Sequence, residues 1–223
     1  MVLPAATHMI AIRHGETAWN VGGRLQGQTD IELNAKGLEQ ARLLAQRLGQ
    51  ERLDAIYSSD LLRAYQTAAE VARMHDGLEI SQLPGLRERH FGYYQGRTFA
   101  QIQEVCPQDA QRWQARDPDF TPGETGESLR VFRSRIVETL DGLAMRHQGQ
   151  TVVVVTHGGV LDMLYRYASD VDLRAPRTWQ IDNTSLSRLV WTASGVKILS
   201  WADTHHLQAG KGCGFLKGTL ADL

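Results

Sequence analysis

The chain alternates short apolar runs with stretches in which apolar residues recur every three or four positions. The first pattern predicts buried strands and the second predicts amphipathic helices. The apolar runs cover 9–13, 55–57, 78–83, 151–156, 186–191 and 196–201. Helical spacing covers 34–48, 61–69 and 129–143, a further helix begins at 160, and 98–116 predicts one or two short helices broken at Pro107. Strands that alternate with helices indicate an α/β domain with a mainly parallel sheet, closed by a hairpin of the last two runs.

Two of these predicted strands run directly into a His-Gly pair. The β-branched run 151–156 is typical of a parallel strand buried on both faces, and it ends at His157-Gly158. The run 9–13 ends at Arg13 and is followed by His14-Gly15. Because ligand sites of open α/β sheets lie outside the carboxyl ends of the strands, we expect both histidines at one edge of the sheet.

The 223 residues suit one domain, 1–223, with two departures from the strand and helix pattern. Residues 92–128 contain the break at Pro107 and a Pro/Gly/Glu-rich stretch, which predicts a small cap inserted over the site. The glycine-rich end, 208–223, predicts a flexible tail rather than a phosphate-binding loop, because no helical pattern follows it.

Composition narrows the range of partners. Lys plus Arg number 24 and Asp plus Glu number 25, so the formal charge of -1 provides no overall field to attract nucleic acid or an anionic membrane. Cys106 and Cys213 are too far apart for a CxxC motif, which fits a reducing compartment. The N-terminus lacks a signal-peptide pattern and no eighteen apolar residues run together, so we expect a cytoplasmic protein. Nothing in the pattern predicts the oligomeric state.

Four cationic or imidazole side chains are expected at the same sheet edge. They are Arg13, His14, Arg63 and His157. Arg63 follows Ser58-Ser59-Asp60, which can cap a helix, and therefore lies in a first helical turn, where an anion is favoured. Two guanidinium groups and two imidazoles form a pocket for a phosphoryl group without a metal or another cofactor.

This pocket predicts phosphate ester hydrolysis through a covalent intermediate. A neutral His14 can act as the nucleophile and carry the phosphoryl group. Glu88, in the charged stretch 86–92, can protonate the leaving alcohol and later deprotonate water. The expected partner is a small phosphorylated metabolite.

Several ordered motifs surround these residues, and together the motifs resemble the histidine phosphatase superfamily, also called the phosphoglycerate mutase-like family, from Ile10 to about Leu207. The motifs are Arg13-His14-Gly15-Glu16-Thr17 with Trp19-Asn20, Arg24-Leu25-Gln26-Gly27, Leu33-Asn34-Ala35-Lys36-Gly37, Ser58-Ser59-Asp60-Leu61 with Arg63-Ala64-Tyr65-Gln66-Thr67-Ala68, Leu86-Arg87-Glu88 with Phe91-Gly92, Gly126-Glu127-Ser128 and Thr156-His157-Gly158-Gly159.

The resemblance implies a three-layer α/β sandwich around a mixed six-stranded sheet. It implies that His14 becomes the phosphohistidine, that Arg13, Arg63 and His157 hold the phosphate, and that Glu88 is the proton donor. It also implies secondary phosphate contacts, from Asn20, Gln26 and the Gly158 N–H.

The same resemblance leaves open whether water or a second substrate hydroxyl receives the phosphoryl group. Mutase-like members carry a longer insertion with an adjacent Arg-Arg pair, whereas Arg97, Arg112 and Arg116 of this chain are not adjacent. We therefore favour a phosphatase over a mutase. Arg89 matches the mutase-like Glu-Arg pattern and is a candidate specificity residue.

Two further alternatives are weaker. A non-catalytic phosphate-binding module would not need the complete set of catalytic side-chain types. A metal hydrolase built from His205-His206, Asp203 and His157 is disfavoured, because adjacent histidines point apart and the carboxylate lacks ligand spacing. The identity of the substrate is left open.

Overall fold

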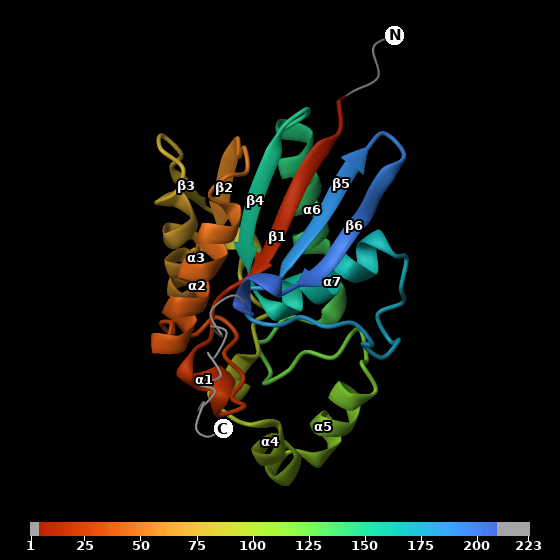
Figure 1. Cartoon of the computed structure of the whole chain (residues 1–223). Helices are drawn as coiled ribbons and strands as arrows, with labels where there is room; N and C mark the ends of the chain where they lie inside the picture. Colours follow the sequence, from red (N-terminus) through yellow and green to blue (C-terminus); the bar gives the residue numbers. More distant parts are fainter. Residues whose placement is uncertain (1–4, 209–223) are drawn as a thin grey trace, which may run out of the picture.

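A computed structural model describes residues 5–208 and shows a six-stranded sheet with the strand order β3-β2-β4-β1-β5-β6 (Figure 1). The strands are β1 (Thr7–Arg13), β2 (Ala55–Ser58), β3 (Ile80–Gln82), β4 (Thr151–Thr156), β5 (Leu186–Thr192) and β6 (Gly195–Asp203). Strands β3, β2, β4 and β1 are parallel neighbours, whereas β5 is antiparallel to both β1 and β6. The predicted mixed, mainly parallel sheet is confirmed.

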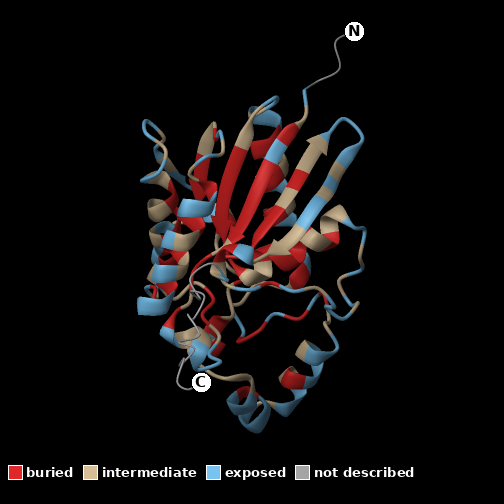
Figure 2. Ribbon diagram, in the orientation of Figure 1, coloured by how far each residue is buried: buried red, intermediate tan, exposed pale blue. Residues whose placement is uncertain are grey.

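Helices cover both faces of this sheet (Figure 1). Helices α2 (Ala35–Leu48) and α3 (Leu62–Ala72) pack on one face, and α6 (Leu129–Arg146) and α7 (Gly158–Ala168) pack on the other. The central strands are buried on both sides, as Figure 2 shows. Successive side chains of β1 accordingly alternate between the two cores, as the period of a strand requires.

Residues 92–128, which we call the cap segment, lie beyond the carboxyl ends of β1 and β4 (Figure 1). They form α4 (Phe99–Val105) and α5 (Pro107–Gln114), and Pro107 occupies the first turn of α5. Tyr94, Ile102 and Phe120 form a small apolar cluster of their own. The helical stretch is thus divided at Pro107, as predicted.

Two local features differ from the sequence-based expectations. The loop 16–30 contains a four-residue helix, α1 (Ala18–Val21), which begins with a capping box of Thr17 and Asn20. At the start of α3 the expected Ser58-Ser59-Asp60 cap is absent, because the N-cap residue is Leu61, which has no side-chain cap. Asp30 accepts a hydrogen bond from the Leu62 N–H at 2.7 Å instead.

Two expectations concern the ends of the chain and membranes. All of the predicted tail except residue 208 lies outside the described residues. Within residues 5–208, no helix has the length and apolar content needed to span a bilayer.

Candidate active site

The two histidines that follow β1 and β4 lie side by side. Arg13 is paired with Thr156 in the parallel register, and the His14 N–H donates to the Thr156 carbonyl at 2.9 Å. The ring centroids of His14 and His157 are 5.2 Å apart, and both side chains are buried. The spacing of neighbouring strands thus brings the two imidazoles together.

The tautomer of His14 follows from its hydrogen bond. Its Nδ1 lies 2.7 Å from the Gly15 carbonyl oxygen, which can only accept, so Nδ1 carries the proton and Nε2 keeps its lone pair. Burial, followed by the nearby charges of Arg63 and Arg13, holds the pKa of His14 well below its ordinary value. The ring is therefore neutral at physiological pH and presents a nucleophilic nitrogen.

His157 is neutral for similar reasons. Burial and then the charge of Arg63 hold the pKa of His157 far below 6.5. Neither of its ring nitrogens has a hydrogen-bond partner in the part of the chain that the structure describes. His157 occupies the N-cap position of α7, and a Cβ built on the next residue, Gly158, would lie 3.5 Å from Arg13 Nε. The N-terminus of α7 therefore adjoins the Arg13 guanidinium.

Arg63 is completely buried, at 0% exposure, and its guanidinium is held by backbone. Nη1 donates to the Thr29 carbonyl at 2.9 Å and Nη2 to the Gly27 carbonyl at 2.7 Å, whereas Nε has no partner among the described residues. Burial lowers the pKa of Arg63 to about 10, so the group is still charged at neutral pH. The Nε–H of this fixed cation is therefore left for a ligand.

Arg13 is arranged in the same way. Its Nη1 donates to the Ile181 carbonyl at 2.7 Å, and its buried Nε has no partner within residues 5–208. Burial lowers the pKa of Arg13, while the charge of Glu88 acts in the opposite direction. The carbonyl that orients Arg13 belongs to the loop between α7 and β5.

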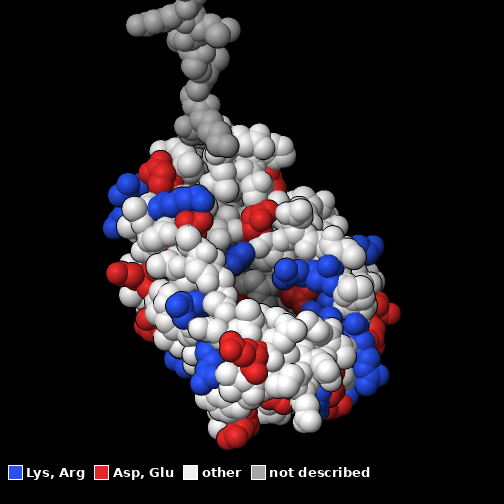
Figure 3. Space-filling model, turned by 90° about the horizontal axis from the view of Figure 1, so that it is seen from below, with Lys and Arg blue, Asp and Glu red and all other residues white. Residues whose placement is uncertain are grey.

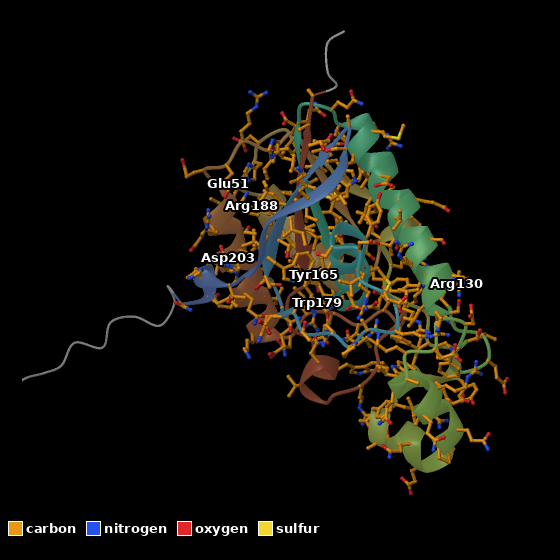
Figure 4. All side chains as sticks on the ribbon, turned by 90° about the vertical axis from the view of Figure 1, so that its right-hand side faces the viewer. Glu51, Arg130, Tyr165, Trp179, Arg188 and Asp203 are labelled. Atoms are coloured by element: carbon orange, nitrogen blue, oxygen red, sulfur yellow. The ribbon has the colours of Figure 1, made fainter. Side chains whose placement is uncertain are left out.

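That loop is fixed by stacked aromatic rings and buried charges. Trp179 stacks on Tyr165 of α7, with centroids 4.1 Å apart and an interplanar angle of 17° (Figure 4). Arg166 donates to the carbonyls of Asp172 and Ala175. The partner of Arg13 is therefore positioned by α7, the helix that begins at the site.

Glu88 lies against the start of α7. Its Oε2 accepts a hydrogen bond from the Gly159 N–H at 2.9 Å, and its Oε1 accepts from the Arg89 N–H at 2.8 Å. A Cβ at Gly159 would lie only 2.1 Å from Oε1, so glycine is required for this close approach. Each carboxyl oxygen keeps a lone pair that can hold a proton, and the role of Glu88 as proton donor stays a prediction.

Of the side chains predicted to make secondary phosphate contacts, Asn20 is already hydrogen-bonded within the protein, whereas the Gln26 Oε1 is not. Asn20 uses its Oδ1 to accept from the Thr17 N–H at 3.0 Å, and Asn183 Nδ2 lies 3.5 Å from the same oxygen. Gln26 is buried, and its Oε1 has no protein partner. Contact of Asn20, Gln26 and the Gly158 N–H with phosphate stays a prediction.

Arg89 is directed into the cap segment. It donates to the carbonyls of Glu127 at 2.6 Å and Phe120 at 3.1 Å, and its guanidinium lies over the rings of Phe91 and Trp113. These contacts hold the backbone of the cap segment. A role of Arg89 in substrate specificity stays a prediction.

Sequence reasoning missed three residues that support the site. Thr67 Oγ1 accepts from the Gly15 N–H at 3.0 Å, and its position four residues after Arg63 was the available signal. Asn183 donates to the His14 carbonyl at 2.9 Å from a loop without any pattern. Arg135 binds several carbonyls around Glu88 from a polar position of α6 that resembles any solvated helix face.

Seen from below, the surface of the molecule is hollowed, and Lys and Arg side chains gather around the hollow with some acidic groups (Figure 3). Within residues 5–208, no three His, Cys, Asp or Glu side chains are grouped so that they could hold a metal ion. His205 instead pairs with Asp203 at 2.6 Å, and His206 lies 3.3 Å from Thr184 Oγ1. The groups at the sheet edge are suited to an anion.

Comparisons with known proteins agree with this geometry. The family model of the histidine phosphatase superfamily (branch 1) matches residues 9–204. A metal-independent phosphoserine phosphatase of Arabidopsis thaliana is 37% identical, over 95% of this chain and 86% of that protein. A probable phosphoglycerate mutase GpmB of Serratia proteamaculans is 35% identical, over 88% of this chain and 93% of that protein.

A solved structure gives the same result for the fold. A mutant phosphoserine phosphatase from Entamoeba histolytica, in complex with phosphoserine, superimposes with a TM-score of 0.82 at 29% identity. The match covers 90% of this chain and 99% of that one. The sheet, the paired histidines and the family match lead to one conclusion: the chain belongs to branch 1 of the histidine phosphatase superfamily.

Proposed function

We propose that the protein is a metal-independent phosphomonoesterase that acts on a small phosphorylated metabolite through a phosphohistidine at His14. The observation that carries the proposal is the set of buried nitrogens without a partner among residues 5–208: Arg13 Nε, Arg63 Nε and both ring nitrogens of His157. Buried polar atoms in proteins are nearly always hydrogen-bonded. A tetrahedral dianion next to His14 would accept from all three side chains.

In the first step, the His14 Nε2 lone pair attacks phosphorus while the bond from phosphorus to the ester oxygen breaks. Arg13 and Arg63 offset the charge of the phosphoryl oxygens, and neither has to move, because carbonyl groups already hold both guanidiniums. Glu88 gives its proton to the departing oxygen, which leaves as an alcohol.

In the second step, water attacks the phosphohistidine. Glu88, now a carboxylate, takes the proton from this water as the N–P bond breaks, and inorganic phosphate and neutral His14 are regenerated. The low pKa of His14 supports both steps, since the free ring is a neutral nucleophile in the first step and, with Nδ1 still protonated, departs from phosphorus as a neutral imidazole in the second.

The proposed substrate class follows from the relatives of the chain. Phosphoserine phosphatases are among the relatives and the solved structures, and we propose phosphoserine or a similar three-carbon phosphate as the substrate. Other members of the comparison carry the name probable phosphoglycerate mutase, which keeps transfer between hydroxyls as the second candidate.

The cap segment favours hydrolysis. Arg112 forms an ion pair with Asp117 at 2.7 Å, and Arg116 donates to Asp162 at 2.9 Å. Neither is free to grip a sugar-acid carboxylate next to a second arginine. Both guanidiniums are thus engaged by carboxylates of the protein, which supports hydrolysis over return of the phosphoryl group to a bound product.

One experiment separates the candidates. The purified enzyme is incubated with phosphoserine, and separately with 3-phosphoglycerate plus catalytic 2,3-bisphosphoglycerate, while inorganic phosphate and 2-phosphoglycerate are followed together. We expect phosphate release in the first incubation and little isomer exchange in the second. Rapid exchange with negligible phosphate release would establish a mutase.

A further inference from the structure

Arg135 of α6 makes an unusual number of hydrogen bonds close to the catalytic carboxyl. Nη1 donates to the carbonyls of Gly85 at 2.8 Å and Arg87 at 3.0 Å, and Nη2 lies 3.3 Å from the carbonyl of Glu88. These acceptors belong to residues 85–88, the segment that carries Glu88. The Arg135 guanidinium thus fixes the backbone of Glu88, while the Gly159 N–H holds its carboxyl group.

The same guanidinium also binds the cap segment. Its Nε and Nη2 form a bidentate pair with Glu127, at 2.8 and 2.7 Å. Glu127 in turn accepts from the His90 N–H at 3.0 Å, and its own N–H donates to the His90 carbonyl at 2.9 Å. Although burial opposes it, the pairing with Arg135 keeps the pKa of Glu127 below its ordinary value, so the carboxylate is ionised at neutral pH. The end of the cap segment and the Glu88 segment therefore share one anchor.

The Gly126-Glu127-Ser128 motif gains a physical explanation from this arrangement. A Cβ at Gly126 would lie 2.7 Å from the His90 carbonyl, so only glycine allows the two segments to approach. Glu127 supplies the carboxylate for Arg135, and Ser128 caps α6 by accepting from the Val131 N–H. Each residue of the motif helps to place Arg135 against the Glu88 segment.

We infer that Arg135 is a positioning residue for the proton donor: together with Glu127 it holds Glu88 at the leaving-group oxygen and couples that position to the cap segment. The inference rests on the proposed role of Glu88. Among residues 5–208, the Arg135 guanidinium makes no hydrogen bond to His14, Arg13 or Arg63, and its charge is the last of the causes that lower the pKa of His157, so its main effect on the reaction passes through Glu88 rather than through the phosphate.

The test compares two leaving groups. An alkyl phosphate such as phosphoserine needs a proton on the departing oxygen, whereas p-nitrophenyl phosphate leaves as a stabilised phenolate and needs it less. Values of kcat/KM report the steps through phosphorylation of His14. We expect Arg135→Met to lower kcat/KM for phosphoserine on the order of 30-fold and for the aryl ester less than about 5-fold. Arg135→Lys should fall between, because lysine keeps the charge but not the bidentate geometry.

A matched control is available on the same helix. Arg130 also joins α6 to the cap segment, through an exposed ion pair with Asp119 at 2.8 Å, and lies on the outer side of the molecule (Figure 4). Arg130→Met should leave both kcat/KM values within about twofold of the wild-type values. Thermal unfolding of each variant checks the fold, and Glu127→Gln, which should show the same leaving-group dependence, replaces Arg135→Met if that variant does not fold.

A double-mutant cycle completes the test. If Arg135 acts through Glu88, its replacement adds little to the loss already caused by Glu88→Gln. Equal losses for both esters, or an undiminished effect of Arg135→Met in the Glu88→Gln background, would overturn the inference and leave Arg135 a purely structural residue. Full activity of Glu88→Gln on phosphoserine would instead refute the proposed proton donor itself.

Discussion

Substituting Gly159 by alanine should disable the proton donor while leaving the fold intact. The new Cβ would lie 2.1 Å from Glu88 Oε1, whereas ordinary contacts begin near 3.4 Å, so the carboxyl must shift by about 1.3 Å. The shift is feasible because the atom that is struck ends a flexible side chain. It also breaks the 2.9 Å hydrogen bond from the Gly159 N–H to Oε2.

The size of the effect can be estimated from this displacement. Moving a catalytic group by about 1 Å can cost on the order of 100-fold in rate, which corresponds to about 2.7 kcal/mol in the activation free energy. Phe132 is 3.2 Å from the new Cβ, so moderate crowding lowers the free energy of unfolding by about 1–2 kcal/mol. We therefore expect a large loss of activity with a small loss of stability.

The assay measures kcat/KM for phosphoserine and for p-nitrophenyl phosphate, together with thermal unfolding. Gly142→Ala, near the C-terminal end of α6, is the control, because a Cβ there has no neighbour within 4 Å. It should keep full activity and gain about 0.5 kcal/mol of stability. If Gly159→Ala loses equal activity toward both esters, the substitution has disturbed His157 or the phosphate pocket. If it keeps most of its phosphoserine activity, the placement of Glu88 as proton donor is wrong.

Three other predictions test the nucleophile, the role of metals and the buried imidazoles. His14→Ala should abolish turnover, and quenched-flow labelling of the wild-type enzyme should trap an acid-labile, base-stable phosphate on His14; label on any other residue would contradict covalent catalysis at this site. Activity should persist in excess EDTA, because Arg13 and Arg63 supply the positive charge; loss on chelation and recovery with Zn²⁺ or Mg²⁺ would favour a metal hydrolase. Because the pKa values of His14 and His157 are lowered in the folded state, the unfolded state takes up more protons below about pH 6.5. The free energy of unfolding, measured with denaturant, should therefore fall with decreasing pH, by up to about 1.4 kcal/mol per pH unit for each histidine, and His14→Ala should make this dependence shallower.

The fold could be predicted from the sequence wherever local pattern and burial agree. The run Thr151–Thr156 could be predicted because a central strand is buried on both faces and its sequence is therefore continuously apolar and β-branched. Helix α1 is different, since four residues are too short to show a period. The cap of α3 was also beyond local reasoning, because its acceptor, Asp30, lies thirty-two residues before the donor.

The site shows the same division. His14 and His157 could be placed together because each follows a predicted parallel strand. The supports of the site come from distant segments: Asn183 reaches His14 across 169 residues, and Arg135 reaches Glu88 across 47. Such contacts depend on tertiary packing that no local pattern of residues encodes. The candidate catalytic residues could therefore be predicted from the sequence, whereas the residues that hold them in position could not.

The pairing of β1 with β4 has a consequence for how such enzymes diversify. The separation of the two imidazoles is set by hydrogen bonds between adjacent strands, which are the same in every parallel sheet. Selection can therefore rewrite the cap segment or the loop before β5 without altering the distance on which phosphoryl transfer depends. Changes in the cap segment and in the loop before β5 can therefore alter which substrate binds, while the backbone pairing of β1 and β4 keeps the two imidazoles in place.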